Sequence, residues 1–207
     1  MRYFSLLLPL LLSPLAVRAQ VKTTTLKPTA VPATLRHAGR VTQALRYTDR
    51  TGTYCVFTTE TGERTSAKVE DGRNADLYAY QYQVPTAGKP ALSWQVHDFV
   101  SDCPVDLEAR FLPGSLTVTD LDQNGTAEVW MVYRTTCRGD VSPSTQKLIM
   151  REGTRKYAMR GNSRIQVGAG QYEGGSYTLD AAWQGAPAAF RQQGAKLWKQ
   201  YLSEKFD

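Results

Sequence analysis

Apolar and polar residues alternate along most of the chain after residue 40, with the period of two that predicts β-strands. In the segment from 75 to 84, this alternation places Tyr78, Tyr80 and Tyr82 on one face of a strand. Gly, Pro, Asn and Asp separate the alternating segments, as they commonly do between short strands. The segments are RVTQALRYT, TYCVFTT, ADLYAYQYQV, LSWQVHDFV, VDLEARFL, GSLTVTDL, AEVWMVYR, QKLIMRE and RKYAMRG. The pattern therefore predicts a sheet-rich domain.

The period changes near the C-terminus, at about residues 185–204. There Phe190, Trp198 and Leu202 fall near one side of a helix, and most of the charged residues fall elsewhere. Because an amphipathic helix must bury its apolar side, we expect it to pack on the sheet. The predicted fold class is α+β, a mainly antiparallel β-sheet domain with one C-terminal amphipathic helix.

The first residues have the layout of a cleavable secretory signal. The basic Arg2 precedes an apolar run, and small or apolar residues stand before Gln20. The run is too short for a membrane span, which needs about 20 residues. We expect a signal peptide over 1–19, a Thr- and Pro-rich tether over 20–39 and a single domain over 40–207. The product is expected to be exported to the periplasm or the cell surface.

Export would expose three cysteines, Cys55, Cys103 and Cys137, to an oxidising compartment. An odd count leaves at least one thiol free or shared. The motifs around Cys103 and Cys137 favour a disulfide between them. A simple meander of three strands would instead place these residues about 30 Å apart, beyond the roughly 7 Å limit between bridged Cα atoms. The disulfide and the simple meander are therefore alternatives.

The segment DLDQNGTAE, residues 120–128, places acids and an Asn-Gly pair between two alternating segments. Calcium takes six to eight oxygen ligands, which loops with alternate acidic residues can supply. An EF-hand needs a bidentate Glu at its twelfth position, which here is Met131, and flanking helices in place of strands. The segment instead resembles the calcium loop of integrin-type β-propeller repeats, although the chain holds no second copy. The candidate ligands are Asp120, Asp122, Asn124, Thr126 and Glu128.

The alternative for this segment is a hairpin turn, because Asn124 and Gly125 both tolerate positive φ. Carboxylates crowded into nine residues repel one another unless a cation neutralises them, which favours a metal. Calcium loops commonly order structure, so we expect a structural ion and not a catalytic one.

Further acids stand on both sides of this loop and would converge on one rim of the sheet if the strands form a meander. Paired carboxylates of this kind can act in glycoside chemistry. Acids in the loops of exported domains are more often solvated or capping groups. The acidic rim would consist of Asp98, Asp102, Asp106 and Asp140.

Two more patterns bear on binding. Tyr78, Tyr80 and Tyr82 form a stripe that would suit glycan contact, because aromatic faces match the apolar faces of sugar rings; the alternative is a sheet face packed under the helix. From Lys147 to Arg164 six basic residues stand against one acid, which would suit an anionic polymer or a solvated strand face. No interleaved aromatic platform supports nucleic acid as a partner, and export argues against it.

Three segments together resemble a family of exported bacterial proteins labelled surface polysaccharide biosynthesis proteins. They are HDFVSDCPVDLEARF, LTVTDLDQNGTAEVWMVYRTTCRGDVSPSTQKLIM and REGTRKYAMRG. The resemblance spans roughly Tyr54 to the C-terminal helix. It implies a bacterial envelope setting and brings no catalytic residues with it.

The function favoured by this resemblance is a non-catalytic binding or assembly factor, with a polysaccharide or another envelope protein as its partner. The nucleophile elbow, the zinc-protease helix and the phosphate-binding glycine loop are missing from the sequence, which weakens the common hydrolase and nucleotide functions. Two alternatives remain. One is a carbohydrate-active enzyme that uses Asp98, Asp102 or Asp140 as acid or base, and the other is a structural envelope protein.

Overall fold

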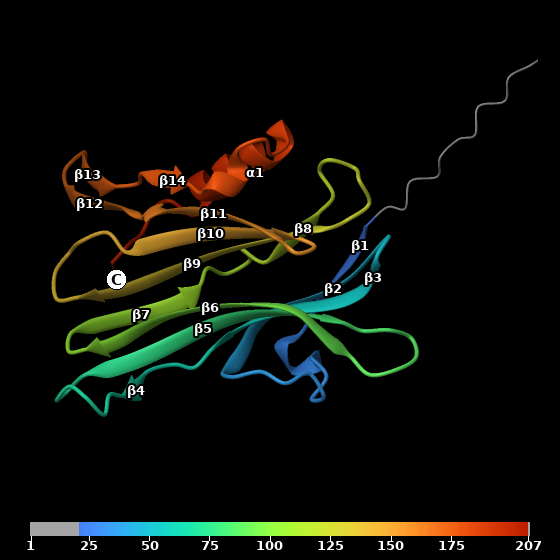
Figure 1. The fold of residues 1–207 in the computed structure, drawn as a ribbon. Helices are drawn as coiled ribbons and strands as arrows, with labels where there is room; N and C mark the ends of the chain where they lie inside the picture. Colours follow the sequence, from blue (N-terminus) through green and yellow to red (C-terminus); the bar gives the residue numbers. More distant parts are fainter. Residues whose placement is uncertain (1–20, 207) are drawn as a thin grey trace, which may run out of the picture.

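The computed structural model describes residues 21–206, so the predicted signal peptide over 1–19 lies outside the described residues. Within this range, two antiparallel sheets stack face to face, and one α-helix covers the outer face of the second sheet (Figure 1). This architecture confirms a mainly antiparallel β-sheet fold with a C-terminal helix. The helix, α1 (Ala188–Gln200), lies inside the range predicted for it.

The N-terminal sheet follows the order β1-β2-β3-β5, and both β4 and β6 pair with β5. Most of its strands match the alternating segments of the sequence. Its strands are β1 (Lys22–Leu26), β2 (Arg40–Asp49), β3 (Gly52–Glu60), β4 (Arg64–Thr65), β5 (Arg73–Gln83) and β6 (Ala91–Cys103).

The C-terminal sheet follows the order β14-β11-β10-β9-β7, and β8 also pairs with β9. A separate hairpin and two short 3₁₀ helices complete the described chain. The strands are β7 (Asp106–Phe111), β8 (Thr117–Thr119), β9 (Glu128–Arg138), β10 (Thr145–Glu152), β11 (Arg155–Asn162) and β14 (Tyr177–Leu179). The hairpin and the 3₁₀ helices are β12 (Arg164–Gly168), β13 (Gln171–Gly174), η1 (Pro28–Ala30) and η2 (Ala181–Trp183).

The central strand β9 is apolar on both faces because each face packs against a different layer. Met131 points into the core between the two sheets. Trp130 points the other way, into the core beneath α1, where it meets Phe190. Because successive side chains of a strand face opposite ways, a strand buried on both sides has a continuous apolar run. The run VWMV therefore marks the centre of the molecule.

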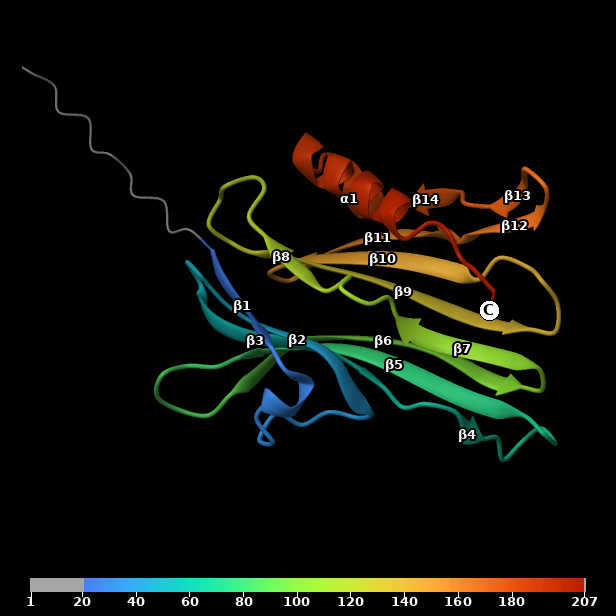
Figure 2. The same cartoon turned by 180° about the vertical axis from the view of Figure 1, so that it is seen from behind.

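The tether predicted over 20–39 is wrong for most of its length. Lys22–Leu26 forms β1, which pairs antiparallel with β2. Leu35 is 1% exposed and packs against the outer face of the N-terminal sheet. Figure 2 shows this segment against the face of the N-terminal sheet that lies away from the C-terminal sheet. The run of threonines, which are β-branched, suits a strand, and turns break the periodicity of the apolar residues that follow.

The disulfide between Cys103 and Cys137 is present, with the two Cα atoms 5.7 Å apart. The simple three-strand meander is wrong, because β7 and β8 both lie antiparallel along β9 and act as one interrupted strand. The chain therefore turns back once between the two cysteines, and they meet at the same end. Cys55 is buried with a free thiol, and its burial raises the pKa of that thiol to about 11.

Within residues 21–206, no helix is long and apolar enough to cross a membrane.

Candidate functional site

The loop between β8 and β9, residues 120–127, is called the acidic loop below, and it brings three of the predicted ligands together. Asp120, Asp122 and Glu128 each offer a carboxylate oxygen, and these oxygens all lie within 4.8 Å of one another. Two oxygens that each lie 2.3–2.6 Å from one calcium ion are at most about 5 Å apart, so the spacing fits a single ion. Carboxylates are the ligands that hard cations prefer. This carboxylate group could therefore hold a metal ion.

Glu128 is the most constrained of the three carboxylates. It is 0% exposed and lies directly opposite Glu152 in the pairing of β9 with β10. Burial raises the pKa of Glu128, and hydrogen bonds from the Thr119 hydroxyl at 2.6 Å and the Leu121 N–H at 3.0 Å oppose that rise. Like charges opposite each other in a sheet are destabilising. A cation beside Glu128 would relieve this repulsion.

The other two predicted ligands, Asn124 and Thr126, make hydrogen bonds within the acidic loop and to its neighbours. Asn124 directs its amide nitrogen to Asp122, at 2.8 Å, and to Glu152, at 2.6 Å. Its amide oxygen accepts the Thr126 N–H at 2.7 Å. The Thr126 hydroxyl accepts a hydrogen bond from Arg50 at 3.2 Å. Asn124 and Thr126 thus shape the loop, and their role as further ligands, with Thr126 acting through its backbone oxygen, stays a prediction.

The acidic loop is fastened to the turn between β2 and β3, which belongs to the other sheet. The Ala127 N–H donates to the carboxylate of Asp49 at 3.0 Å, and the Arg50 N–H donates to the Gly125 carbonyl at 2.9 Å. Gly125 has a φ of +80°, and an added Cβ would lie 3.1 Å from the Arg50 side chain. The positive φ is the reason that a glycine suits this position. The loop thus ties the two sheets together at this end.

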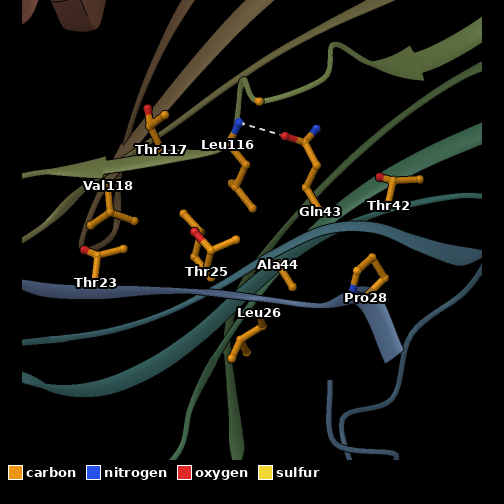
Figure 3. Close-up of a pocket in the computed structure, with 12 residues that line it drawn as sticks. Thr23, Thr25, Leu26, Pro28, Thr42, Gln43, Ala44, Leu116, Thr117 and Val118 are labelled. Carbon is orange, nitrogen blue, oxygen red and sulfur yellow. Dashed lines mark hydrogen bonds between the residues drawn. The ribbon is translucent and has the colours of Figure 1, made fainter. Parts of the chain in front are cut away.

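A cleft opens next to this tie, between β1 and β2 on one side and β8 and the residues before it on the other (Figure 3). Its volume is about 620 Å³, and among the described residues that line it none is charged. Gln43 spans the cleft by donating to the Leu112 carbonyl at 3.1 Å and accepting the Leu116 N–H at 3.2 Å. The lining of this neutral cleft is Thr23, Thr25, Leu26, Pro28, Thr42, Gln43, Ala44, Leu45, Gly114, Leu116, Thr117 and Val118.

The four acids of the predicted rim do not share one hollow. Asp98 lies on β6, forms an ion pair with Lys147 and lines a cleft rich in basic residues. Asp102 accepts a hydrogen bond from the Ser66 hydroxyl at 2.5 Å. Asp106 and Asp140 line a third hollow, of about 340 Å³. The prediction of a single rim depended on the simple meander, and it fails with that meander.

The tyrosine stripe is mostly covered. Tyr80 and Tyr82 are 5% and 8% exposed and pack with Phe57 and Leu35, while Tyr78 is half-buried and stacks on His97 with ring centroids 4.3 Å apart. The stripe is therefore a packed sheet face, but the alternative that placed it under the helix named the wrong cover. The N-terminal segment covers it, and α1 does not, because α1 packs on the other sheet.

Comparisons with known proteins add no relative, because no family model, curated protein or solved structure matches the chain. The resemblance to exported surface polysaccharide proteins stays a prediction.

Sequence reasoning missed the residues outside the acidic loop that hold it in place. They are Asp49 and Arg50, from the β2–β3 turn, and Glu152, at the end of β10. The turn itself was visible as DRTG, but nothing in the spacing shows that it meets a loop some 75 residues later.

Proposed function

We propose that this protein is an exported, non-catalytic binding or assembly factor in bacterial surface polysaccharide biosynthesis, with a structural calcium ion in its acidic loop. Asp120, Asp122 and Glu128 would hold the ion. When bound, the ion supplies the positive charge that neutralises the three carboxylates and fixes the loop. The observation that carries the proposal is the place of the loop, which fastens the two sheets beside the neutral cleft.

The chemistry of the neutral cleft suits an uncharged stretch of a saccharide. Threonine hydroxyls, such as those of Thr23 and Thr25, can exchange hydrogen bonds with sugar hydroxyls, and Leu116 and Val118 can pack against C–H faces. The cleft volume of about 620 Å³ falls within the usual range for small-molecule sites, which is about 300–1,000 Å³. Figure 3 shows Thr23 and Val118 facing one another from opposite walls.

The acidic loop controls one wall of this cleft. Strand β8, which carries Thr117 and Val118, leads directly into Asp120, and the Thr119 hydroxyl donates to Glu128. An ordered loop holds β8 in register with β9, and a disordered loop releases it. Calcium should therefore strengthen saccharide binding without touching the saccharide.

The test is glycan binding by the chain from residue 20, on a panel of neutral bacterial oligosaccharides, with excess calcium and with excess chelator. We expect the unaltered protein to bind a neutral glycan, and to bind it less tightly with chelator. Thr25→Glu places a charge on the cleft wall and should weaken binding by about tenfold, because the charge loses solvent when the glycan binds. Thr24→Glu, on the same exposed strand but outside the lining, is the matched control and should bind normally.

Equal binding by Thr25→Glu and the unaltered protein would contradict the proposed site, as would a lack of binding to every neutral glycan. Shortening of the glycan that is abolished by Asp98→Asn would support the carbohydrate-active enzyme instead. Co-purification with an envelope protein, without glycan affinity, would support the structural role.

A further inference from the structure

Strands β10 and β11 place like charges directly opposite each other. Lys147 lies opposite Arg160, and Arg151 lies opposite Lys156. Between the two basic pairs, Ile149 lies opposite Ala158, and both of these residues belong to the core between the sheets. The alternation of a strand puts all four basic residues on that same face. Like charges at opposed positions repel and destabilise a sheet, so this arrangement needs a source of negative charge.

One of the two basic pairs has negative charge nearby. Lys147 forms an ion pair with Asp98 of β6, and Arg160 lies 3.9 Å from a carboxylate oxygen of Asp180. For the other pair, Arg151 and Lys156, no carboxylate of residues 21–206 lies within ion-pair distance. The protein therefore compensates one end of this surface and leaves the other positive.

Arg151 stacks on an aromatic ring, but one of its buried N–H donors has no acceptor among the described residues. Its guanidinium lies over the ring of Trp94, 5.2 Å from the ring centroid. Its Nε is buried and has no hydrogen-bond partner in the described part of the chain. Burial of its guanidinium lowers the pKa of Arg151. A buried donor left unpaired is costly. The side chain as a whole is only partly buried, so an anion in front of it would compensate the charge of the guanidinium.

A cleft of about 370 Å³ opens in front of these groups, and it is called the basic cleft below. Lys147, Arg151, Lys156 and Arg160 line it from the C-terminal sheet, and Asp98 lines it from β6. Four basic side chains against one acid leave a net positive lining. The volume of about 370 Å³ lies near the lower end of the usual range for small-molecule sites, about 300–1,000 Å³, and suits a charged sugar unit or a small anion.

We propose that the basic cleft binds an anionic group of carboxylate or phosphate type that is carried by a saccharide. Arg151 and Lys156 contact the anion, and Trp94 positions Arg151 by stacking. The recognition of the anion rests on the cleft alone, and its attachment to a saccharide rests on the proposed function. The neutral cleft and the basic cleft have no lining residue in common, so the two proposals concern separate sites.

The experiment measures the affinity of the chain from residue 20 at low ionic strength for four probes. Trigalacturonate carries carboxylates on sugars, glucose 6-phosphate carries a phosphate on a sugar, maltotriose carries no charge, and inorganic phosphate carries no sugar. We expect trigalacturonate or glucose 6-phosphate to bind more tightly than both maltotriose and inorganic phosphate. Added salt should weaken this binding.

The variants Arg151→Gln and Lys156→Gln should each weaken binding of the charged sugar by about tenfold, because each removes one of the two contacts to the anion. Lys156 is exposed, so its variant keeps the test valid if the change at Arg151 disturbs folding. The matched control is Lys196→Gln with Lys199→Gln, a loss of two exposed positive charges on α1. This control should bind as the unaltered protein does.

Binding of the charged sugars that is unchanged in both cleft variants would overturn the proposal, and so would an equal loss in the α1 control. A complete lack of binding by the unaltered protein would overturn it too. Inorganic phosphate that binds as tightly as either charged sugar would overturn the assignment to a saccharide. The proposed function fails separately, through Thr25→Glu, because that variant leaves the basic cleft intact.

Discussion

The acidic loop and the basic cleft meet at one end of β10, and they manage like charges in opposite ways. Glu152 faces Glu128 across the sheet, and the preceding residue, Arg151, faces Lys156. Because neighbouring residues of a strand point to opposite faces, the acidic pair and the basic pair lie back to back. The acidic loop supplies its own partners: the Leu121 N–H donates to Glu128, and other loop N–H groups donate to its aspartates. Arg151 and Lys156 have no carboxylate partner among the described residues.

This difference follows from what each kind of backbone offers. A loop has N–H groups free of any ladder, and these are the donors that carboxylates accept from. On a sheet face the carbonyls are engaged in the ladder, so a guanidinium finds few acceptors there. An acidic cluster in a loop can thus be partly satisfied by its own chain before an ion binds. A basic pair on a sheet face depends on an acceptor from outside.

Glu204 adds a third case to the comparison, because the fold itself provides the positive charge that pairs with this acid, from Arg138. It is 7% exposed, forms an ion pair with Arg138 at 2.7 Å and accepts hydrogen bonds from Ser144 and Ser163. Burial alone would raise the pKa of Glu204, but these partners outweigh burial and lower it to about 2. The shift from 4.5 to about 2 corresponds to about 3 kcal/mol of stability, present above pH 4.5 and lost as the pH falls toward 2.

Glu204→Gln should therefore lower the free energy of unfolding by about 3 kcal/mol at pH 7, the largest effect predicted here. The gap between the variant and the unaltered protein should close as the pH is lowered from about 4.5 to about 2. Urea unfolding at several pH values measures it. A gap that does not change with pH would show that Glu204 contributes by packing and not by charge.

Calcium tests the acidic side of the comparison. An ion at 100 times its dissociation constant should stabilise the protein by about 2.7 kcal/mol, which raises Tm by roughly 5–10 °C for a chain of this size. The variant Asp120→Ala, Asp122→Ala should lose this shift. The control Asp106→Ala, Asp140→Ala, which removes two exposed acids elsewhere, should keep it. Melting curves that coincide in calcium and in chelator would mean that the N–H donors of the loop suffice.

Lys156→Gln gives the smallest expected effect and tests the basic side. The change removes the repulsion with Arg151 and leaves the stacking on Trp94 in place, so stability should rise by about 0.5 kcal/mol without any ligand. The gain should shrink at high salt, because screening already weakens the repulsion. A loss of stability would show that Lys156 has a favourable partner and is not part of an uncompensated pair.

The strands and the helix were predictable because burial of one face makes apolar residues recur along the sequence with the period of that element. The path of the chain was harder to predict. VDLEARFL and GSLTVTDL each have the pattern of a strand, but whether they lie side by side or end to end depends on a partner, here β9, that the pattern does not name. The residues at 22–26 were missed because their strand is exposed along most of its length and so lacks apolar alternation.

The sites show the same limit. The spacing of Asp120, Asp122 and Glu128 predicted their convergence, because a tight loop determines it locally. The roles of Asn124 and Asp49 depend on side-chain rotation and on contact between the sheets, which local spacing does not determine. The opposition of the basic residues on β10 and β11 was partly predictable. The turn EGTR at residues 152–155 indicates a hairpin, and a hairpin fixes which basic residues oppose each other.

The disulfide makes the two ends of the β-sandwich different, because it joins the sheets covalently at one end alone. Cys103 ends β6 in one sheet, and Cys137 lies near the end of β9 in the other, so a covalent hinge joins the sheets at the end of β9 farthest from the acidic loop. Hydrogen bonds between the acidic loop and the β2–β3 turn join the sheets at the opposite end. The two sheets are thus joined at both ends, by a covalent bond at the cysteines and by hydrogen bonds beside the neutral cleft. Reducing agents would break the covalent connection between the sheets, whereas a cation would act on the hydrogen-bonded connection at the acidic loop.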